Sequence, residues 1–252
     1  MEARTLALQA ALEKDHWWYA GRREVLRSLL PPVGPGARVL DAGCGPGGNR
    51  MILPAGASPV ALDPSPLAIR LSRRYAYGSR LRGDLTRLPF PGGSFDLVLA
   101  LDVLEHLDDE EAGLREVARV LRPGGRAAIA VPAFRALWGL QDRLAHHRRR
   151  YRRPALLRAL RGAGLEAERS TYFNALMLPA IWAGRQLLRV VPHRLESEAQ
   201  IAVPGLNGAL RALFAAERHL LRLADLPFGV SIFCLARRPE QTSPAPRLIR
   251  GS

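Results

Sequence analysis

The segment from Arg38 to Gly48, Arg-Val-Leu-Asp-Ala-Gly-Cys-Gly-Pro-Gly-Gly, constrains the fold more than any other part of the chain. Val39 and Leu40 are typical of the end of a short buried strand. The glycines that follow leave almost no side chain in the turn, so backbone N–H groups can approach a ligand closely beside the start of a helix. Asp41 precedes the glycines, and its carboxylate is expected at the lip of the cleft, where it would hold a cationic ligand. The segment therefore predicts a ligand-binding turn between a strand and a helix.

The chain around this turn alternates predicted strands and helices. The patterns indicate strands over 37–41, 58–62, 80–83, 95–101 and 126–131, and helices over 48–54, 65–75 and 108–121, with a turn at 123–125. Such alternation predicts a doubly wound sheet that binds ligands at the carboxyl ends of its strands. Acids follow four of these strands, and we expect them along a single edge: Asp41, Asp63, Asp84 and Asp102.

Helical patterns flank this core on both sides. Two helices are expected within residues 5–30, and the second of them ends at Pro31 and Pro32. A helix over 154–163 and a strand over 165–172 follow the core. Residues 174–226 are expected to be helical with breaks at Pro192, Pro204 and Gly205, and the last strand is expected over 229–237. We therefore expect an N-terminal helical lid (1–36), a binding domain (37–238) with a helical substrate-side insertion (174–226), and a disordered tail (239–252).

The glycine pattern alone is compatible with two kinds of ligand. Gly43, Gly45 and Gly48 satisfy G-x-G-x-x-G, and Asp63 stands 20 residues after Gly43, as a dinucleotide site requires. An NAD-linked oxidoreductase is therefore one alternative. The carboxylate of Asp41 disfavours a pyrophosphate nearby, whereas it favours the ammonium group of a methionine moiety.

Several motifs in this order resemble the class I S-adenosylmethionine-dependent methyltransferases. The motifs lie between residues 37 and 132: Val-Leu-Asp-Ala-Gly-Cys-Gly-Pro-Gly (39–47), Ala-Leu-Asp-Pro-Ser (61–65), Gly-Asp-Leu (83–85), Phe-Asp-Leu-Val-Leu-Ala-Leu-Asp-Val-Leu-Glu-His-Leu (95–107) and Leu-Arg-Pro-Gly-Gly (121–125). The flanking segments 16–23, 146–151 and 172–175 resemble a bacterial subgroup whose members often act on small molecules, sugars or lipid-linked intermediates. The resemblance implies a Rossmann-like, seven-stranded α/β sheet whose last strand is antiparallel.

The resemblance also implies how S-adenosylmethionine would be held. Asp63 would accept hydrogen bonds from both ribose hydroxyls, since its carboxylate offers two oxygens. Asp84 would bind the adenine amino group and the Leu85 N–H a ring nitrogen, while Tyr19 with Arg22 or Arg23 would reach the methionine carboxylate. The full set of expected cofactor-binding residues is Tyr19, Arg23, Asp41, Gly43, Cys44, Gly45, Asp63, Pro64, Asp84, Leu85, Leu101, Asp102 and Val103.

Histidines and a tyrosine are the candidates for acid–base work on an acceptor. His106 could take a proton from the acceptor, because its ordinary pKa suits neutral pH, or could simply pack on the next helix. His146 and Tyr151 are further catalytic candidates. Trp18, His147, Tyr172 and Asn174 are expected to line the acceptor pocket. The adjacent histidines have no Asp, Glu or Cys at a supporting spacing, so no metal ion is expected.

Composition limits the partners and the compartment. The net charge of +14 rests on arginine, since Lys14 is the only lysine, which indicates genome composition bias more than a nucleic-acid surface. The arginines between 148 and 153 do form a cluster that could attract an anion. Two distant cysteines indicate neither a disulfide nor a zinc site, and no secretory leader or membrane-spanning stretch is expected. A cytoplasmic protein is predicted.

These features together predict a methyltransferase for a small-molecule acceptor. Its cofactor would be S-adenosylmethionine, with S-adenosylhomocysteine as the product and without a metal. RNA or protein methylation, an NAD-linked oxidoreductase and a non-catalytic binding protein remain alternatives. No nucleic-acid partner is expected, because no separate nucleic-acid-binding module and no Asn-Pro-Pro-Tyr-like element stand in the chain. The apolar helices 175–191 and 206–224 could pair two copies in a homodimer.

Overall fold

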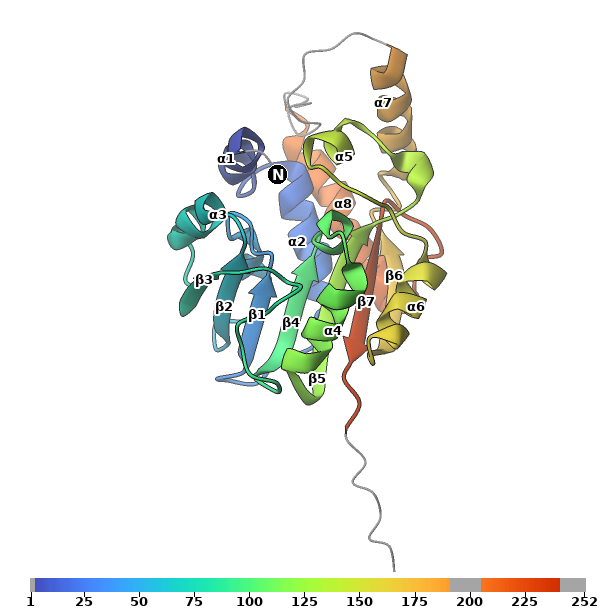
Figure 1. Ribbon diagram of the computed structural model, residues 1–252. Helices are drawn as coiled ribbons and strands as arrows, with labels where there is room; N and C mark the ends of the chain where they lie inside the picture. The colour runs from blue at the N-terminus through green and yellow to red at the C-terminus, as the bar shows by residue number, and fades with distance from the viewer. Residues whose placement is uncertain (1–2, 191–204, 241–252) are drawn as a thin grey trace, which may run out of the picture.

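A seven-stranded mixed sheet forms the centre of the molecule (Figure 1). The computed structural model describes residues 3–190 and 205–240. The sheet has the order β3-β2-β1-β4-β5-β7-β6, and β7 is antiparallel to both β5 and β6. The strands are β1 (Arg38–Ala42), β2 (Ser58–Asp63), β3 (Ser79–Arg82), β4 (Phe95–Leu101), β5 (Leu121–Pro132), β6 (Glu166–Phe173) and β7 (Ser231–Arg237). The predicted doubly wound fold with an antiparallel last strand is confirmed.

Helices cover both faces of this sheet. They are α1 (Ala3–Leu12), α2 (Trp17–Leu29), α3 (Pro66–Leu71), α4 (Glu110–Val120), α5 (Leu140–Leu144), α6 (Arg153–Gly162), α7 (Leu178–Val190) and α8 (Asn207–Leu223). Two helix starts follow directly from the sequence. The Ser65 hydroxyl accepts the Ala68 N–H at the start of α3, and the Asp109 carboxylate accepts the Ala112 N–H at the start of α4.

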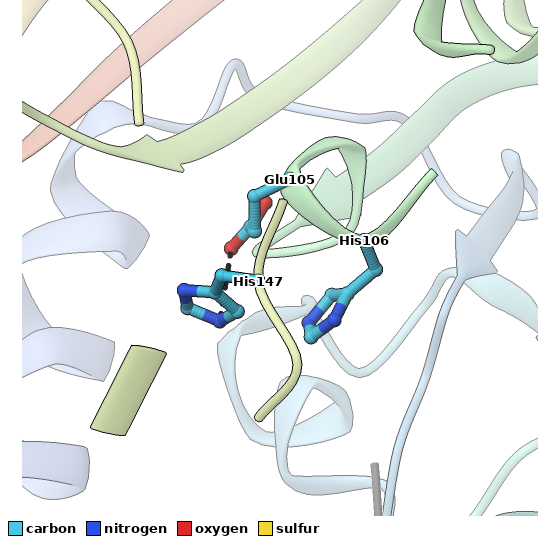
Figure 2. Close-up of side chains that lie close together, drawn as sticks. All are labelled: Glu105, His106 and His147. Carbon is cyan, nitrogen blue, oxygen red and sulfur yellow. Dashed lines mark ion pairs between the residues drawn. The ribbon is translucent and has the colours of Figure 1, made fainter. Parts of the chain in front are cut away.

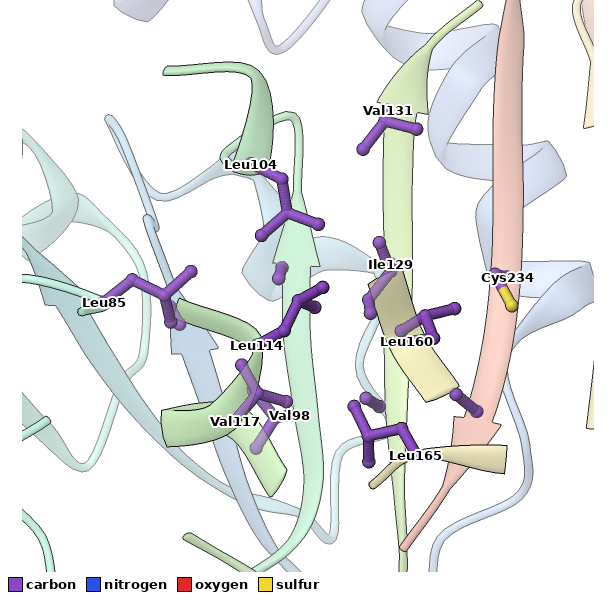
Figure 3. Close-up of a cluster of buried hydrophobic side chains, with 14 of the residues drawn as sticks. Leu85, Val98, Leu104, Leu114, Val117, Ile129, Val131, Leu160, Leu165 and Cys234 are labelled. Carbon is purple, nitrogen blue, oxygen red and sulfur yellow. The ribbon is translucent and has the colours of Figure 1, made fainter. Parts of the chain in front are cut away.

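Alternating side chains of the central strands fill two separate cores. On one face, Val98 and Ile129 pack against Leu114 and Val117 of α4 and Leu160 of α6 (Figure 3). On the other face, the neighbouring strand positions pack against α2 and α8: Leu97, Leu99, Ala128, Ala130 and Phe233. A sheet buried on both faces explains why its strands read as nearly continuous apolar runs.

Some elements differ locally from their predicted form. The helix expected over 48–54 is a short 3-10 helix, η1 (Gly48–Ile52), and the helix expected over 65–75 divides into α3 and the 3-10 helix η2 (Ser72–Arg74). The turn expected at 123–125 lies within β5, where the pairing shifts between Phe95 and Leu97 of β4. The short helix α5 was not predicted, because five residues carry too little periodicity to detect.

The N-terminal helices play different parts. Helix α2 buries Val25, Leu26 and Leu29 between the sheet and α8, so it belongs to the core. Helix α1 lies beside α3 at the β3 side of the sheet (Figure 1).

The division into a lid, a domain and a tail stays a prediction. The breaks expected at Pro192 and Pro204, and the tail beyond residue 240, lie outside the described residues. No helix in the described ranges is long and apolar enough to span a bilayer.

Candidate functional site

The glycine turn after β1 has the geometry that its sequence predicts. Gly43 adopts φ +82°, and a Cβ there would lie 2.4 Å from the Cγ2 of Val103, so no side chain fits. Gly45 also has a positive φ of +53°, but its surroundings are open, with Gln9 Nε2 as the nearest atom at 3.8 Å from an added Cβ. The turn is fastened to the sheet because the N–H groups of Gly43 and Cys44 both donate to the Leu62 carbonyl, at 2.7 and 3.0 Å. The open side at Gly45 therefore leaves room for a ligand.

Asp63 faces this turn from the end of β2. Its Oδ2 accepts the Gly45 N–H at 2.9 Å and its Oδ1 accepts the Ser65 N–H at 2.8 Å. Burial raises the pKa of its carboxyl, and the two backbone hydrogen bonds oppose that rise. Each carboxylate oxygen retains a further lone pair. Asp63 can therefore accept hydrogen bonds from a ligand while it stays fixed by the turn.

Asp41 lies beneath the glycine turn, and its predicted position at the lip of the cleft is wrong. The side chain is fully buried, with Oδ2 accepting from the Tyr77 hydroxyl at 2.5 Å and Oδ1 from Asn49 Nδ2 at 3.0 Å. Burial raises the pKa of this carboxyl to about 6. Asp41 does not line the cavity, and its two hydrogen bonds connect the end of β1 to Asn49 and Tyr77, so the side chain supports the turn from within.

A cavity of about 670 Å³ extends from the glycine turn past the end of β4 to α7. This volume lies within the range of about 300–1,000 Å³ that is usual for small-ligand sites. At one end the lining includes Gly45, Asp63 and Leu85. At the other end it includes His106 and His147. Twelve of the thirteen expected cofactor residues, all except Asp41, line this cavity, and so do Trp18, His106 and His147; their roles remain predictions.

Asp84 and Leu85 stand at the edge of the first end. The Asp84 Oδ1 accepts both the N–H and the hydroxyl of Thr86 at 2.7 Å. Its carboxylate is thereby held in one orientation, while the Leu85 side chain is 3% exposed and packs against α4. The pair follows β3 as the sequence predicts.

Aromatic and charged side chains from α2 form the middle of the cavity wall. Trp18 and Tyr19 meet edge to face at 5.0 Å, and the Arg22 guanidinium lies 5.7 Å from the Trp18 ring centroid. Arg22 also donates to Asp102 Oδ2 at 2.5 Å, which links α2 to the end of β4. Arg23 donates instead to the backbone carbonyls of Glu13 and Lys14. Of the two arginines, Arg22 therefore reaches further toward the reacting end of the cavity.

Two histidines and a glutamate meet at the far end (Figure 2). The rings of His106 and His147 lie edge to face with centroids 4.8 Å apart, and His147 Nε2 is 3.9 Å from Glu105 Oε1. Burial and the neighbouring His147 lower the pKa of His106 to about 4, so this imidazole is neutral at physiological pH. Burial, followed by the charge of Asp102, raises the pKa of Glu105 well above its usual range.

Four predicted site residues lie away from the cavity. The His146 side chain is exposed, and the Tyr151 hydroxyl donates to Glu110. Tyr172 stacks on Phe134 at 5.1 Å, and its hydroxyl accepts the Arg153 N–H at 3.3 Å. Asn174 is 1% exposed, and its backbone N–H donates to Glu217. None of these four residues lines the cavity, which contradicts their predicted positions beside the acceptor.

Two residues that line the cavity, Glu105 and Arg150, and the buried Asp142 behind them were missed or undervalued by the sequence prediction. Asp142 and Arg150 form a buried pair, with Nε–Oδ1 2.7 Å and side chains 0% and 3% exposed. Asp142 also accepts from His147 Nδ1 at 2.9 Å. Glu105 was interpreted as a helix-start charge, yet it is fully buried at the cavity edge. The only signal for Asp142 was its position five residues before His147, which is too weak without the fold.

Comparisons with known proteins match this chain to methyltransferases. A family model described as a methyltransferase domain matches residues 40–129. A demethylmenaquinone methyltransferase of Mycobacterium sp. (strain KMS) is 41% identical over 120 residues, which are 47% of this chain and 50% of that protein. A ubiquinone biosynthesis O-methyltransferase of Xanthomonas axonopodis pv. citri (strain 306) is 32% identical over 186 residues, 61% of this chain and 77% of that protein.

Solved structures share the same fold. The methyltransferase in complex with the Haloferax volcanii Trm112 methyltransferase activator superposes with a TM-score of 0.63 at 23% identity, covering 95% of this chain and 96% of that one. Geranyl diphosphate methyltransferase, solved with GPP and sinefungin, gives a TM-score of 0.58 at 19% identity, covering 87% and 78%. The chain belongs to the class I S-adenosylmethionine-dependent methyltransferases. The chain spans about half the length of the mycobacterial relative.

Proposed function

We propose that the protein transfers the methyl group of S-adenosylmethionine to a small organic acceptor. The observation that carries this proposal is the single cavity that joins the glycine turn and Asp63 to the histidine pair. S-adenosylmethionine supplies an electrophilic methyl group on a sulfonium, so the protein chiefly needs to bind and orient the two reactants. Such positioning can contribute on the order of 7–11 kcal/mol to the rate.

The residues at the glycine end fit the adenosyl part of this cofactor. Asp63 offers lone pairs toward the ribose hydroxyls, and the open side of Gly45 allows close approach of the backbone. Asp84 and Leu85 would read the adenine ring. Arg22 and Tyr19 would bind the methionine carboxylate; the cofactor residues predicted from the sequence include Arg23, with Arg22 as the alternative.

The far end would hold the acceptor. Helix α7 contributes Ile181 and Arg185 to the cavity wall, opposite His106 and His147. A cavity of about 670 Å³ is of the size that holds a small organic molecule, which supports such an acceptor. Two relatives are a demethylmenaquinone methyltransferase and a ubiquinone biosynthesis O-methyltransferase, and their names are consistent with a small-molecule acceptor.

The arginine cluster gives little support to RNA as the acceptor. Arg148 pairs with Asp108 at 2.6 Å, Arg149 with Glu110 at 3.3 Å, and Arg150 with buried Asp142. Arg149 also donates to the Leu107 and Asp108 carbonyls. These side chains fasten the segment after α5 to the segment after β4, so their charge is already paired within the protein.

The proposal is tested with labelled methyl donor and three acceptor fractions. Purified protein is incubated with S-adenosylmethionine carrying a labelled methyl group and with a metabolite extract, bulk RNA or a protein extract. We expect label in the metabolite fraction alone. Label confined to RNA or protein would contradict the small-molecule acceptor, and thermal stabilisation by NAD but not by S-adenosylhomocysteine would contradict the cofactor.

We also infer a cytoplasmic location, which the sequence predicts, and a homodimer, for which the sequence offers two apolar helices that could pair. The exposed apolar side chains of α7 and α8 support the dimer, among them Trp182, Leu187, Leu213 and Leu220. Light scattering after size-exclusion chromatography measures the mass directly. A single-chain mass at micromolar concentration would contradict the dimer.

A further inference from the structure

Glu105 is buried without a hydrogen-bond partner among the described residues, and its one printed ion-pair contact is with His147 at 3.9 Å. Its side chain is 0% exposed, and neither carboxylate oxygen has a hydrogen bond from another residue of the described chain. An unpaired buried carboxylate costs several kcal/mol, roughly, and is retained only where something compensates it. The cationic side chains nearest to it are already paired, Arg150 with Asp142 and Arg22 with Asp102. The position therefore lacks a positively charged or donating group.

His147 presents a second acceptor to the same point. Asp142 Oδ1 lies 2.9 Å from His147 Nδ1, and Asp142 is itself held by Arg150 and by the Gly139 N–H at 2.7 Å. A carboxylate accepts, so the His147 proton bound by Asp142 lies on Nδ1, and Nε2 is the ring nitrogen nearer to Glu105. Nε2 and Glu105 Oε1 are 3.9 Å apart, which is too far for a hydrogen bond. Two lone pairs that face each other at this distance are suited to a cation between them.

His106 completes a set of three. A hydrogen bond from its ring to the Ala145 backbone occupies one nitrogen, which leaves the other as an acceptor. Each of the residues Glu105, His106 and His147 offers one ligand atom, and these three atoms lie within 4.8 Å of one another (Figure 2). In a tetrahedral site with bonds of about 2.0–2.2 Å, ligand atoms stand roughly 3.3–3.6 Å apart. Small side-chain rotations would bring these three atoms to that spacing.

We propose that Glu105, His106 and His147 bind a divalent transition metal ion of the zinc type at the acceptor end of the cavity. Two imidazoles and one carboxylate are a donor set that catalytic zinc sites use, with a further position left for a small ligand. The carboxylate of Asp142 behind His147 is the usual support of a metal-binding imidazole. The carboxylates of Glu105 and Asp142 outnumber the one guanidinium of Arg150 at this place, so a bound divalent ion would supply positive charge where acids are in excess.

The site also narrows the acceptor class, and this part rests on the proposed function. All three residues line the cavity, so an oxygen of the acceptor could coordinate the ion there. The acceptor would then carry a hydroxyl group, or two adjacent oxygens, near the carbon or oxygen that receives the methyl group. The sequence analysis expected no metal ion, and that expectation stays untested; it did not consider these three residues together, because Glu105 and His106 stand some 40 residues before His147.

The test measures zinc binding by the full chain without an affinity tag. Titration calorimetry and metal analysis after dialysis should give one Zn²⁺ per chain. Glu105→Gln and His147→Gln should each weaken the affinity by at least a hundredfold, and Asp142→Asn by about 10–100-fold. His219→Gln removes an exposed histidine of α8 and should leave the affinity unchanged. Co²⁺ in place of zinc should give the visible absorption of a four- or five-coordinate ion.

Specific outcomes would overturn the proposal. Wild-type protein that retains no zinc would show that a proton between His147 and Glu105 fills this role instead. Equal zinc affinity in Glu105→Gln and wild type would place the ion elsewhere. If Glu105→Gln does not fold, His147→Gln and the cobalt spectrum of the wild type still decide. Calorimetry with S-adenosylhomocysteine on the same samples separates this from the proposed function, since zinc binding without cofactor binding would contradict the latter alone.

Discussion

The two ends of the cavity are built in different ways. The glycine end comes from consecutive residues, 41–48, together with the ends of β2 and β3, and backbone N–H groups hold its key carboxylate. The far end combines the segment after β4 with the segment around α5 and with α7, and side chains hold one another there. A backbone-built site needs little more than glycines and one acid, whereas a side-chain-built site depends on every partner being present. The far end is thus the part that can differ between relatives that share a cofactor.

The buried Asp142–Arg150 pair gives the largest expected effect. Asp142→Ala leaves Arg150 buried without its carboxylate partner, which should lower the free energy of unfolding by about 3–5 kcal/mol. Chemical denaturation measures this loss. S-adenosylhomocysteine affinity of the folded variant should stay at the wild-type value, because the pair touches only the far end. A large loss of cofactor affinity would contradict the claim that the pair supports only the far end of the cavity.

Asp41 should make the glycine end sensitive to pH. Its pKa is about 6 in the folded protein against an ordinary value near 3.8, so the folded state holds the proton more tightly than the unfolded state. Its contribution to stability is therefore full at low pH and is lost as pH rises through 6. The shift corresponds to about 3 kcal/mol.

Asp41→Asn removes this titration. The free energy of unfolding of the variant minus that of wild type should rise between pH 4 and pH 7, by up to about 3 kcal/mol. Denaturant unfolding at several pH values measures the difference. A difference that does not change with pH would show that Asp41 is already ionised at low pH in the folded protein.

The two turn glycines offer a matched comparison within the cofactor end. Gly43→Ala and Gly45→Ala both place a side chain at positive φ, but only the first also collides with Val103. Gly43→Ala should therefore be more destabilising than Gly45→Ala by about 1–3 kcal/mol. Thermal unfolding of the two variants measures this. Equal melting temperatures would show that the loop moves freely away from β4.

The sequence predicts most of the fold and of the glycine end of the cavity but little of the far end, for physical reasons. The glycine turn, Asp63 and Asp84 lie within short motifs whose backbone geometry requires those residue types. Asp41 was placed wrongly because its carboxylate is buried in a hydrogen bond with Tyr77, which stands 36 residues later in the sequence. His146 and Tyr151 were chosen with His147, yet only His147 turns inward. Which of three nearby side chains faces a cavity depends on tertiary contacts such as Asp142 with Arg150, which no local pattern encodes.

The smallest effect is expected at a site outside both ends. Trp182 on α7 is 53% exposed. Trp182→Ser should change the free energy of unfolding by less than about 0.5 kcal/mol and leave cofactor affinity unchanged. Denaturation at a protein concentration below any dimer formation measures it. A loss of several kcal/mol would mean that this side chain is covered in solution.

Binding of S-adenosylhomocysteine to wild type and to Asp63→Ala tests the central claim most directly. Calorimetry should give one molecule per chain for wild type. Loss of two hydrogen bonds to a carboxylate, at about 1.5 kcal/mol each, should weaken the affinity of Asp63→Ala by about a hundredfold. Asp108→Ala, which removes an exposed carboxylate, should bind like wild type. Absence of heat with wild type, or an unchanged dissociation constant in a folded Asp63→Ala, would contradict the account.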